Sequence, residues 1–173
     1  MTEQSALFVP VSAAETAVDK YRKKLDPART CGIPAHITVL FPFMPPDAIG
    51  SSHLELLEEV FTASSPFDFA LSEVRWFDDR VVYLAPDDPA PFVEMTMQLM
   101  ERFPDYPPYG GAYADVIPHV CVGESADVRA MRKAASRVAK RLPITAHARE
   151  VWLMVGSDAP NSWTVRRSFS LGQ

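Results

Sequence analysis

Two short segments of the chain share one pattern, in which a histidine close behind a proline begins an apolar run. They are residues 34–39, PAHITV, and residues 118–122, PHVCV. Such runs favour extended strands, in which residues i and i+2 point to the same face. His36 and Thr38 therefore share a face of one predicted strand, and His119 and Cys121 share a face of another. Two such strands constrain the chain to a sheet fold whose two imidazoles can supply the base and the acid of one reaction.

Length and composition restrict the chain to a small globular fold. Its 173 residues fit one domain, or two small lobes around a shared core. Hydrophobic residues make up 47% and charged residues 23%, a balance that argues against long disordered segments. We therefore expect a single domain, 1–173, with two lobes related by a weak internal repeat.

Net charge and cysteine content indicate which binding partners and which cellular compartment to expect. A net charge of -5 argues against a protein that holds long nucleic acid through its phosphates, so we expect phosphate recognition only within a small site. We expect no membrane partner, because there is no run of about 18 apolar residues and no signal-peptide pattern at the N-terminus. The two cysteines, Cys31 and Cys121, predict free thiols in a reducing cytoplasm. We also expect a monomer.

Hydrophobic periodicity predicts the element order β-α-β-α-β-β-α-β-α-β-β. The expected strands cover residues 6–11, 36–43, 67–76, 80–85, 119–123, 146–155 and 162–171. The first helix is predicted to begin with a capping box from Ser12 to Glu15 and to be closed by Pro27. Two further helices are expected at about 52–62 and 89–103, and a fourth follows a cap at Ser125.

The fourth predicted helix has one strongly basic face. Its members are Arg129, Arg132, Lys133, Arg137, Lys140 and Arg141. Several of them lie near the C-terminal end of the helix, where cations suit the helix dipole, so we interpret the face as solvated rather than as a phosphate-binding patch. Each half of the chain then has a histidine strand, a helix and two further strands. This arrangement predicts an α+β fold.

Paired histidines are suited to phosphoester chemistry. A histidine has an ordinary pKa near 6.5 and can act in either protonation state at neutral pH. Opening a cyclic phosphodiester requires a base that activates water and an acid that protonates the departing alkoxide, and such help contributes about 10²–10⁴-fold. A hydroxyl two residues beyond each histidine would donate to the non-bridging phosphate oxygens, where charge must be stabilised.

The segments IPAHITVLFPF and VIPHVCVG resemble the paired His-x-Thr/Ser motifs of the two-histidine (2H) phosphoesterase superfamily, which includes the 2′-5′ RNA ligase and cyclic phosphodiesterase families. The resemblance extends to the strand–helix order and to the closing segment 169–172. It implies two antiparallel sheet lobes with pseudo-two-fold symmetry, flanked by helices around a central groove. It also implies a cytoplasmic phosphoric diester hydrolase that needs no metal or cofactor.

The same resemblance implies the substrate class and the site residues. The substrate would be a small nucleotide or RNA-end phosphodiester, such as a 2′,3′-cyclic phosphate or a 2′-5′-linked nucleotide. His36 and His119 become the catalytic acid–base pair, and Thr38 a phosphate donor. Which histidine is the acid and which the base stays open.

Cys121 is the departure from the family pattern, because it stands at the second phosphate-binding position, where the pattern has threonine or serine. A thiol is a weak hydrogen-bond donor, and a thiolate would repel phosphate. A lost hydrogen bond to a charged group costs about 1.5–3 kcal/mol, or roughly ten- to a hundred-fold in rate. Activity is then reduced, the substrate is changed, or backbone N–H groups hold the phosphate instead.

Other hypotheses remain open at this point. The chain is alternatively a non-catalytic module that binds a nucleotide or RNA end, with Cys121 as its degenerate position. A third hypothesis is a zinc site formed by His36, His119 and Cys121, although no CxxC or HxxxH spacing supports it. Two details are also undecided. Tyr106 and Tyr109 form a base-stacking lid or pack on the domain, and either Arg166 or Arg167 reaches the groove.

Overall fold

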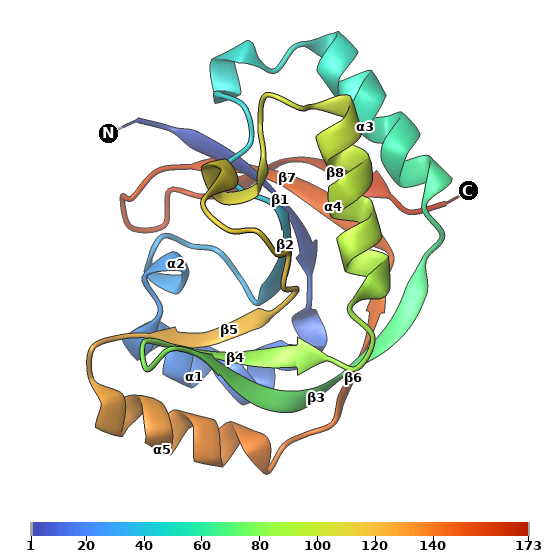
Figure 1. Cartoon of the computed structure of the whole chain (residues 1–173). Coiled ribbons are helices and arrows are strands. Elements are labelled where there is room, and N and C mark those ends of the chain that lie inside the picture. The colour runs from blue at the N-terminus through green and yellow to red at the C-terminus, as the bar shows by residue number, and fades with distance from the viewer. Residues whose placement is uncertain (1, 173) are drawn as a thin grey trace.

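Two four-stranded antiparallel sheets and five α-helices form the protein in a computed structural model that describes residues 2–172 (Figure 1). Met1 and Gln173, the end positions of the predicted 1–173 domain, lie outside the described residues. The strands are β1 (Gln4–Pro10), β2 (His36–Leu40), β3 (Phe67–Phe77), β4 (Val81–Pro86), β5 (Val120–Glu124), β6 (Ile144–Ala148), β7 (Glu150–Gly156) and β8 (Thr164–Ser170). The helices are α1 (Glu15–Leu25), α2 (Pro27–Thr30), α3 (Ser51–Ala63), α4 (Ala90–Arg102) and α5 (Val128–Ala139).

The two sheets have corresponding strand orders. One sheet has the order β2-β1-β7-β8, and the other has the order β5-β4-β3-β6. In both, the strand that carries or directly follows a motif histidine is an edge strand. Its single neighbour, β1 or β4, pairs with it in antiparallel register. The predicted α+β fold with two antiparallel sheets and flanking helices is therefore confirmed.

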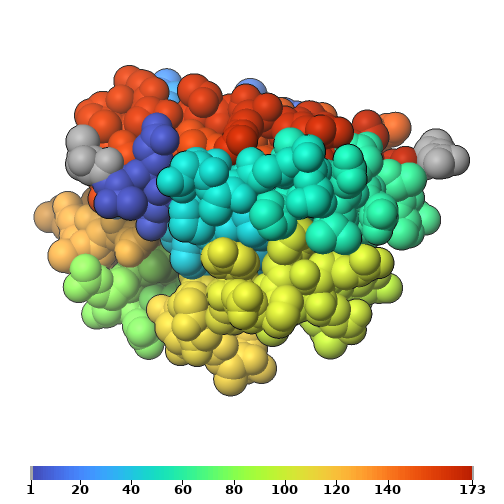
Figure 2. Space-filling view, turned by 90° about the horizontal axis from the view of Figure 1, so that it is seen from above, coloured from blue at the N-terminus to red at the C-terminus, as the bar shows by residue number. Residues whose placement is uncertain are grey.

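Helices cover each sheet and join the two layers. Helices α1 and α5 pack against β5, whereas α4 packs against β2 and α3 against β8. The view from above shows the α3 region lying between the C-terminal strands and α4 with its following loop (Figure 2). Buried side chains of both sheets belong to one hydrophobic core, as Leu7 and Ile37 of one sheet and Val82 and Val122 of the other illustrate.

Burial along the two histidine segments follows the predicted period of two. In β2, Ile37 and Val39 are buried while His36 and Thr38 are half-buried. At β5, the valines on either side of Cys121 are buried, and Cys121 itself is half-buried. The motif side chains thus share the more open face of each edge strand, and the valines and isoleucine anchor the opposite face in the core.

The predicted start and end of the first helix are wrong in detail. No capping box forms, because residues 12–14 make a short 3₁₀ turn without a side-chain cap. The Glu15 carboxylate instead accepts a 2.6 Å hydrogen bond from the Ala35 N–H, next to His36. Pro27 does not simply close the helix: Asp26 caps a second short helix, α2, in which Pro27 occupies the first turn. A tertiary contact has therefore replaced the local one that the sequence pattern suggested.

Two other boundaries also differ from the prediction. The α5 cap is Asp127, whose carboxylate accepts from the Ala130 N–H, while Ser125 accepts from the Asp127 N–H. The single strand expected over 146–155 is two strands in different sheets, since β6 pairs with β3 and β7 pairs with β1. The chain passes from one sheet to the other at Arg149. A period-2 pattern continues across such a passage and does not reveal it.

The basic face of α5 is exposed, as expected, and the helix buries Met131, Ala135 and Val138. In the described part of the chain, no helix has the length and apolar character needed to cross a bilayer.

Candidate active site

The two motif histidines come from the two edge strands, one from each sheet. His36 is the first residue of β2, and His119 immediately precedes β5. Strands β2 and β5 lie in contact, and the charge of a protonated His119 slightly lowers the pKa of His36. The sequence motifs, far apart along the chain, are thus brought to one place by the pairing of two similar sheets.

Both imidazoles are oriented by the same backbone contact. The Nδ1 atom of His36 lies 2.7 Å from the Pro34 carbonyl oxygen, and the Nδ1 atom of His119 lies 2.7 Å from the Ile117 carbonyl oxygen. A carbonyl only accepts hydrogen bonds, so Nδ1 carries the proton in each neutral ring. This tautomer leaves Nε2 with a lone pair for proton transfer in both rings.

Aromatic rings pack against each histidine, from β1 at His36 and from β3 and β4 at His119. The ring of Phe8 lies 4.1 Å from that of His36, and Phe8 stands opposite Thr38 in the β1–β2 register. The rings of Phe77 and Tyr83 lie 5.1 and 5.3 Å from that of His119. Tyr83 stands opposite Cys121 in the β4–β5 register, as Phe8 does opposite Thr38. We call His36 with Thr38 the first half-site and His119 with Cys121 the second half-site. The two half-sites therefore correspond in their supporting residues as well as in their histidines.

Burial lowers the pKa of both histidines, but their charged neighbours differ. The pKa of His36 falls to about 4, first because its ring is desolvated and then because the Arg22 guanidinium repels a second positive charge. Desolvation also lowers the pKa of His119, and the Asp26 carboxylate acts in the opposite direction on both rings, whereas Arg22 acts on His36. Both rings are therefore predominantly neutral at pH 7.

The first half-site contains Thr38 and a loop tyrosine. Burial raises the pKa of the Tyr109 phenol, and the nearby Thr38 hydroxyl lowers it to a smaller extent. Tyr109 is held over β2 by its own N–H, which donates to the Phe41 carbonyl at 2.6 Å, and its φ of 52° lies in the left-handed region. Tyr113 packs edge-on against it and is 71% exposed.

Cys121 occupies the second half-site and interacts with a carboxylate. Its thiol lies close to Asp26, and burial together with that negative charge raises the thiol pKa well above its ordinary value. The group is therefore a neutral thiol at pH 7 and not a thiolate. At the position two residues beyond each histidine, Thr38 therefore lies beside a phenol, whereas Cys121 lies beside a carboxylate.

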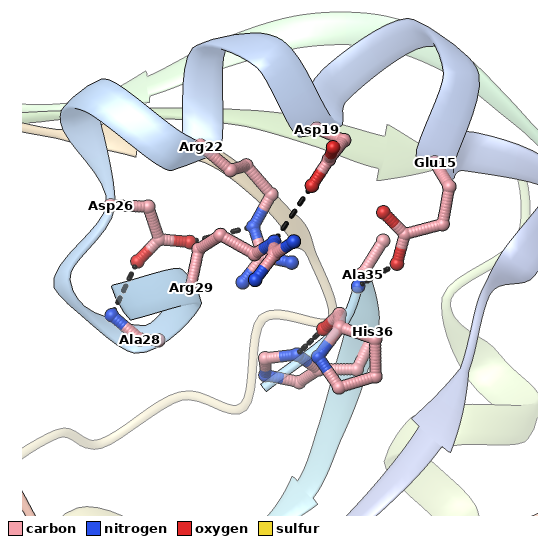
Figure 3. Close-up of polar contacts among 9 residues, drawn as sticks. Glu15, Asp19, Arg22, Asp26, Ala28, Arg29, Ala35 and His36 are labelled. Atoms are coloured by element: carbon pink, nitrogen blue, oxygen red, sulfur yellow. Dashed lines mark hydrogen bonds and ion pairs between the residues drawn. The ribbon is translucent and has the colours of Figure 1, made fainter. Parts of the chain in front are cut away.

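Arg22 and Asp26 form a buried ion pair behind this half-site. Arg22 Nε donates to Asp26 Oδ2 at 2.7 Å, with side chains 1% and 3% exposed. The other carboxylate oxygen accepts from the Ala28 N–H at 3.0 Å. Figure 3 shows the two side chains reaching from the end of α1 and the start of α2 toward the segment that carries His36. Sequence reasoning missed this pair; its i,i+4 spacing at a helix end is typical of surface ion pairs.

The remaining predicted candidates lie elsewhere. Tyr106 packs against Phe43 of the core. Arg166 donates to the carbonyls of Pro46 and Ile49, and Arg167 pairs with Glu58. The lid formed jointly by Tyr106 and Tyr109 is therefore not observed, and neither arginine contacts a motif histidine.

Cysteines and metal-binding groups can also be placed. Both cysteines are free thiols. Within residues 2–172 no group of three or more His, Cys, Asp and Glu side chains is arranged to hold a metal ion, so the zinc hypothesis gains no support from side-chain geometry.

Comparison with known proteins agrees with the fold. The structure is similar to TT0787 of Thermus thermophilus, with a TM-score of 0.65 and 19% identity over 100% of both chains. It is similar to E. coli LigT complexed with 3′-AMP, with a TM-score of 0.60 and 15% identity, and to E. coli LigT complexed with phosphate, with a TM-score of 0.59 and 17% identity, each over 100% of both chains. None of the curated proteins matches the sequence.

The family itself is identified from the sequence. The chain matches the 2′-5′ RNA ligase superfamily over residues 9–160, a range that contains both histidine motifs and the Arg22–Asp26 pair. This match confirms the family that the two motifs predicted. The chain belongs to the 2′-5′ RNA ligase superfamily.

Proposed function

We propose that the protein is a phosphoesterase that opens a small phosphodiester, such as a 2′,3′-cyclic phosphate or a 2′-5′-linked nucleotide, with His36 and His119 as its general acid–base pair. One observation carries the proposal above the others. Both imidazoles have Nδ1 fixed by a backbone carbonyl at 2.7 Å, so both present Nε2 for proton transfer. Structural histidines have no need of this matched arrangement on two different sheets.

The proposed reaction balances without a cofactor. One imidazole removes a proton from water at Nε2 while the water oxygen forms a bond to phosphorus. The bond from phosphorus to the ring oxygen breaks, and the other imidazole, protonated, gives its Nε2 proton to the departing alkoxide. The product is a phosphomonoester next to a free hydroxyl. Thr38 is the proposed donor to a non-bridging oxygen, and the phosphate displaces the Tyr109 phenol from it.

The two histidines differ in ways that suggest separate roles. At His36 the Arg22 guanidinium opposes protonation more strongly than the Asp26 carboxylate favours it, whereas at His119 the charge that shifts the pKa is the Asp26 carboxylate, which favours the imidazolium. We therefore assign the base to His36 and the acid to His119 for hydrolysis. The assignment reverses for ligation, since the same groups act in the opposite direction.

The substrate class follows from chemistry and from the relatives. A site with two imidazoles and one hydroxyl suits one phosphodiester group. E. coli LigT was crystallised with 3′-AMP and with phosphate, so nucleotides of that size are the appropriate first probes. The test is a panel of 2′,3′-cyclic nucleotides and 2′-5′-linked dinucleotides, assayed with a chelator present. Turnover that His36→Asn and His119→Asn both abolish supports the proposal, and undiminished turnover in both variants contradicts it.

A non-catalytic binding module is the second candidate, and Cys121 is the observation that favours it. Its thiol lies close to Asp26 and offers only a weak donor in place of a hydroxyl. Calorimetry distinguishes the two candidates. A binding module would take up a cyclic nucleotide tightly and leave it intact after long incubation, whereas the enzyme converts it to a monophosphate.

A further inference from the structure

Arg22 is the largest fully buried side chain of the protein, and most of its hydrogen-bonding capacity is unused. Only Nε has a partner: neither Nη1 nor Nη2 is hydrogen-bonded to any of residues 2–172. Buried N–H groups without partners are costly and rare in native proteins. Buried ion pairs are in addition weak contributors to stability. The fold alone therefore gives no reason for a guanidinium at this place.

The position of Arg22 connects it to the candidate site. It extends from α1, which packs against β5, toward the segment that carries His36 (Figure 3). Its charge accordingly lowers the pKa of His36 on one sheet and that of the Cys121 thiol on the other. Two neighbouring cations are already occupied, since Lys23 and Arg29 both pair with Asp19 at 2.7 Å. Figure 3 shows the pair that Arg29 makes. Arg22 is thus the cation whose charge acts on both half-sites and whose terminal amino groups are free.

We propose that Arg22 is the phosphate-binding cation of the histidine site, and that its two free amino groups bind phosphoryl oxygens on the side where Cys121 stands in place of a hydroxyl. The inference rests on the proposed function. A guanidinium matches phosphate geometry through parallel N–H···O bonds, and these charge-assisted bonds are stronger than the bond that a hydroxyl makes. Arg22 would then supply from behind β5 the recognition that the thiol cannot supply.

In the free protein the guanidinium is 1% exposed, so binding requires a covering side chain to turn aside. We assign this movement to Cys121. Its side chain has a single rotatable bond, and its thiol, which lies close to the Asp26 carboxylate, is only a weak donor. When the phosphoryl group enters, this weak contact is exchanged for charge-assisted bonds from Arg22.

The test uses inorganic phosphate as the probe and NMR titration of the full chain as the measurement. The decisive variant is the double substitution Arg22→Met and Asp26→Asn, which removes both charges together. Because a neutral, similarly sized replacement of a buried ion pair is commonly tolerated, this variant is expected to fold. Its phosphate affinity should fall roughly ten- to a hundred-fold.

Three single variants make the result specific. Asp26→Asn keeps the Arg22 guanidinium, removes the competing carboxylate and should tighten phosphate binding. Arg29→Met removes a neighbouring arginine that pairs with Asp19 and should leave the affinity at the wild-type value. Arg22→Lys keeps the ion pair but loses the planar pair of amino groups, so it should weaken binding even if the double variant does not fold.

Wild-type phosphate affinity in a folded double variant would overturn the inference, as would wild-type affinity in Arg22→Lys or a wild-type protein that binds no phosphate. The outcome is separate from that of the proposed function. A protein that binds phosphate through Arg22 but hydrolyses no phosphodiester contradicts the function alone. Turnover that is unchanged in the double variant contradicts the inference alone.

Discussion

The first half-site, with His36 and Thr38, and the second, with His119 and Cys121, have the same backbone plan and different polar surroundings. In each, the imidazole Nδ1 bonds to the carbonyl two residues upstream, and an aromatic residue stands opposite the position two residues beyond the histidine. Thr38 contacts the phenol of a surface loop, whereas Cys121 contacts the carboxylate of a buried ion pair. The histidines have kept their matched geometry although the residues that would bind phosphate differ.

This difference separates two requirements of a phosphoesterase. Proton transfer needs both imidazoles in defined tautomers, and both half-sites meet that need in the same way. Charge stabilisation needs donors directed at phosphate, and we propose that these differ in chemical form, a hydroxyl on one side and a guanidinium on the other. Variants that make the two half-sites more alike, or that remove a residue from one of them, test whether proton transfer and charge stabilisation are separate in this way.

The largest effect is expected when either imidazole is removed. His36→Asn and His119→Asn should each lower kcat for a cyclic nucleotide about 10²–10⁴-fold, because each removes one general acid–base group. Steady-state kinetics measures the loss, and circular dichroism checks that the fold is kept. If one variant keeps wild-type kcat, the two half-sites do not share the proton-transfer work.

Exchanging the residues at the two aligned positions should have the next largest effect. Thr38→Cys replaces the strong donor with a weak one and should lower kcat/KM about ten- to a hundred-fold. Cys121→Thr restores a hydroxyl to the second half-site and should raise kcat/KM, since hydroxyl and guanidinium then act together. A loss of activity in Cys121→Thr would show that the thiol has a role that a hydroxyl cannot take over.

A smaller effect is expected from the loop that covers the first half-site. Tyr109→Phe removes the phenol that occupies the Thr38 hydroxyl in the free protein. The net worth of a neutral hydrogen bond is about 0.5–1.5 kcal/mol, so KM should fall roughly two- to ten-fold with little change in kcat. A lower kcat with unchanged KM would instead place the phenol among the groups that act in the transition state.

The smallest expected effect concerns stability at low pH. The pKa of His36 is lowered from 6.5 to about 4, so between these values the unfolded chain binds a proton that the folded chain rejects. The contribution of His36 to the free energy of unfolding is therefore fully present above pH 6.5, and it is lost as the pH falls toward 4. Thermal unfolding of the wild type should therefore depend on pH more steeply across this range than that of His36→Asn. Equal slopes would contradict the lowered pKa.

The fold and the two histidines were accessible from the sequence because they depend on local, periodic signals. The alternation of His36, Ile37, Thr38 and Val39 specifies a strand and its two faces without reference to the rest of the chain. The passage between sheets at Arg149 was not accessible, because a strand pattern does not say which sheet a strand joins. Contacts made across the fold, such as Glu15 with Ala35, replaced the local cap that the sequence suggested.

The environment of Cys121 was the least predictable part of the site. Arg22 and Asp26 have the spacing of an ordinary surface pair, and only the packing of α1 against β5 buries them. Tyr109 reaches Thr38 from a distant proline-rich loop, where its left-handed backbone directs it over β2. Contacts that charged and aromatic residues make through tertiary packing cannot be predicted from the hydrophobic periodicity of the sequence.

The central claim is that two imidazoles with lowered pKa values share the proton transfers, one neutral as the base and the other protonated as the acid. The most direct measurement is the pH dependence of kcat/KM for adenosine 2′,3′-cyclic phosphate with a chelator present. Because burial lowers the pKa of both His36 and His119, we expect a bell-shaped profile whose maximum lies below pH 6.5 and whose rate falls as the pH rises further. A profile that rises to a plateau above neutrality, or activity that the chelator abolishes, would contradict the account.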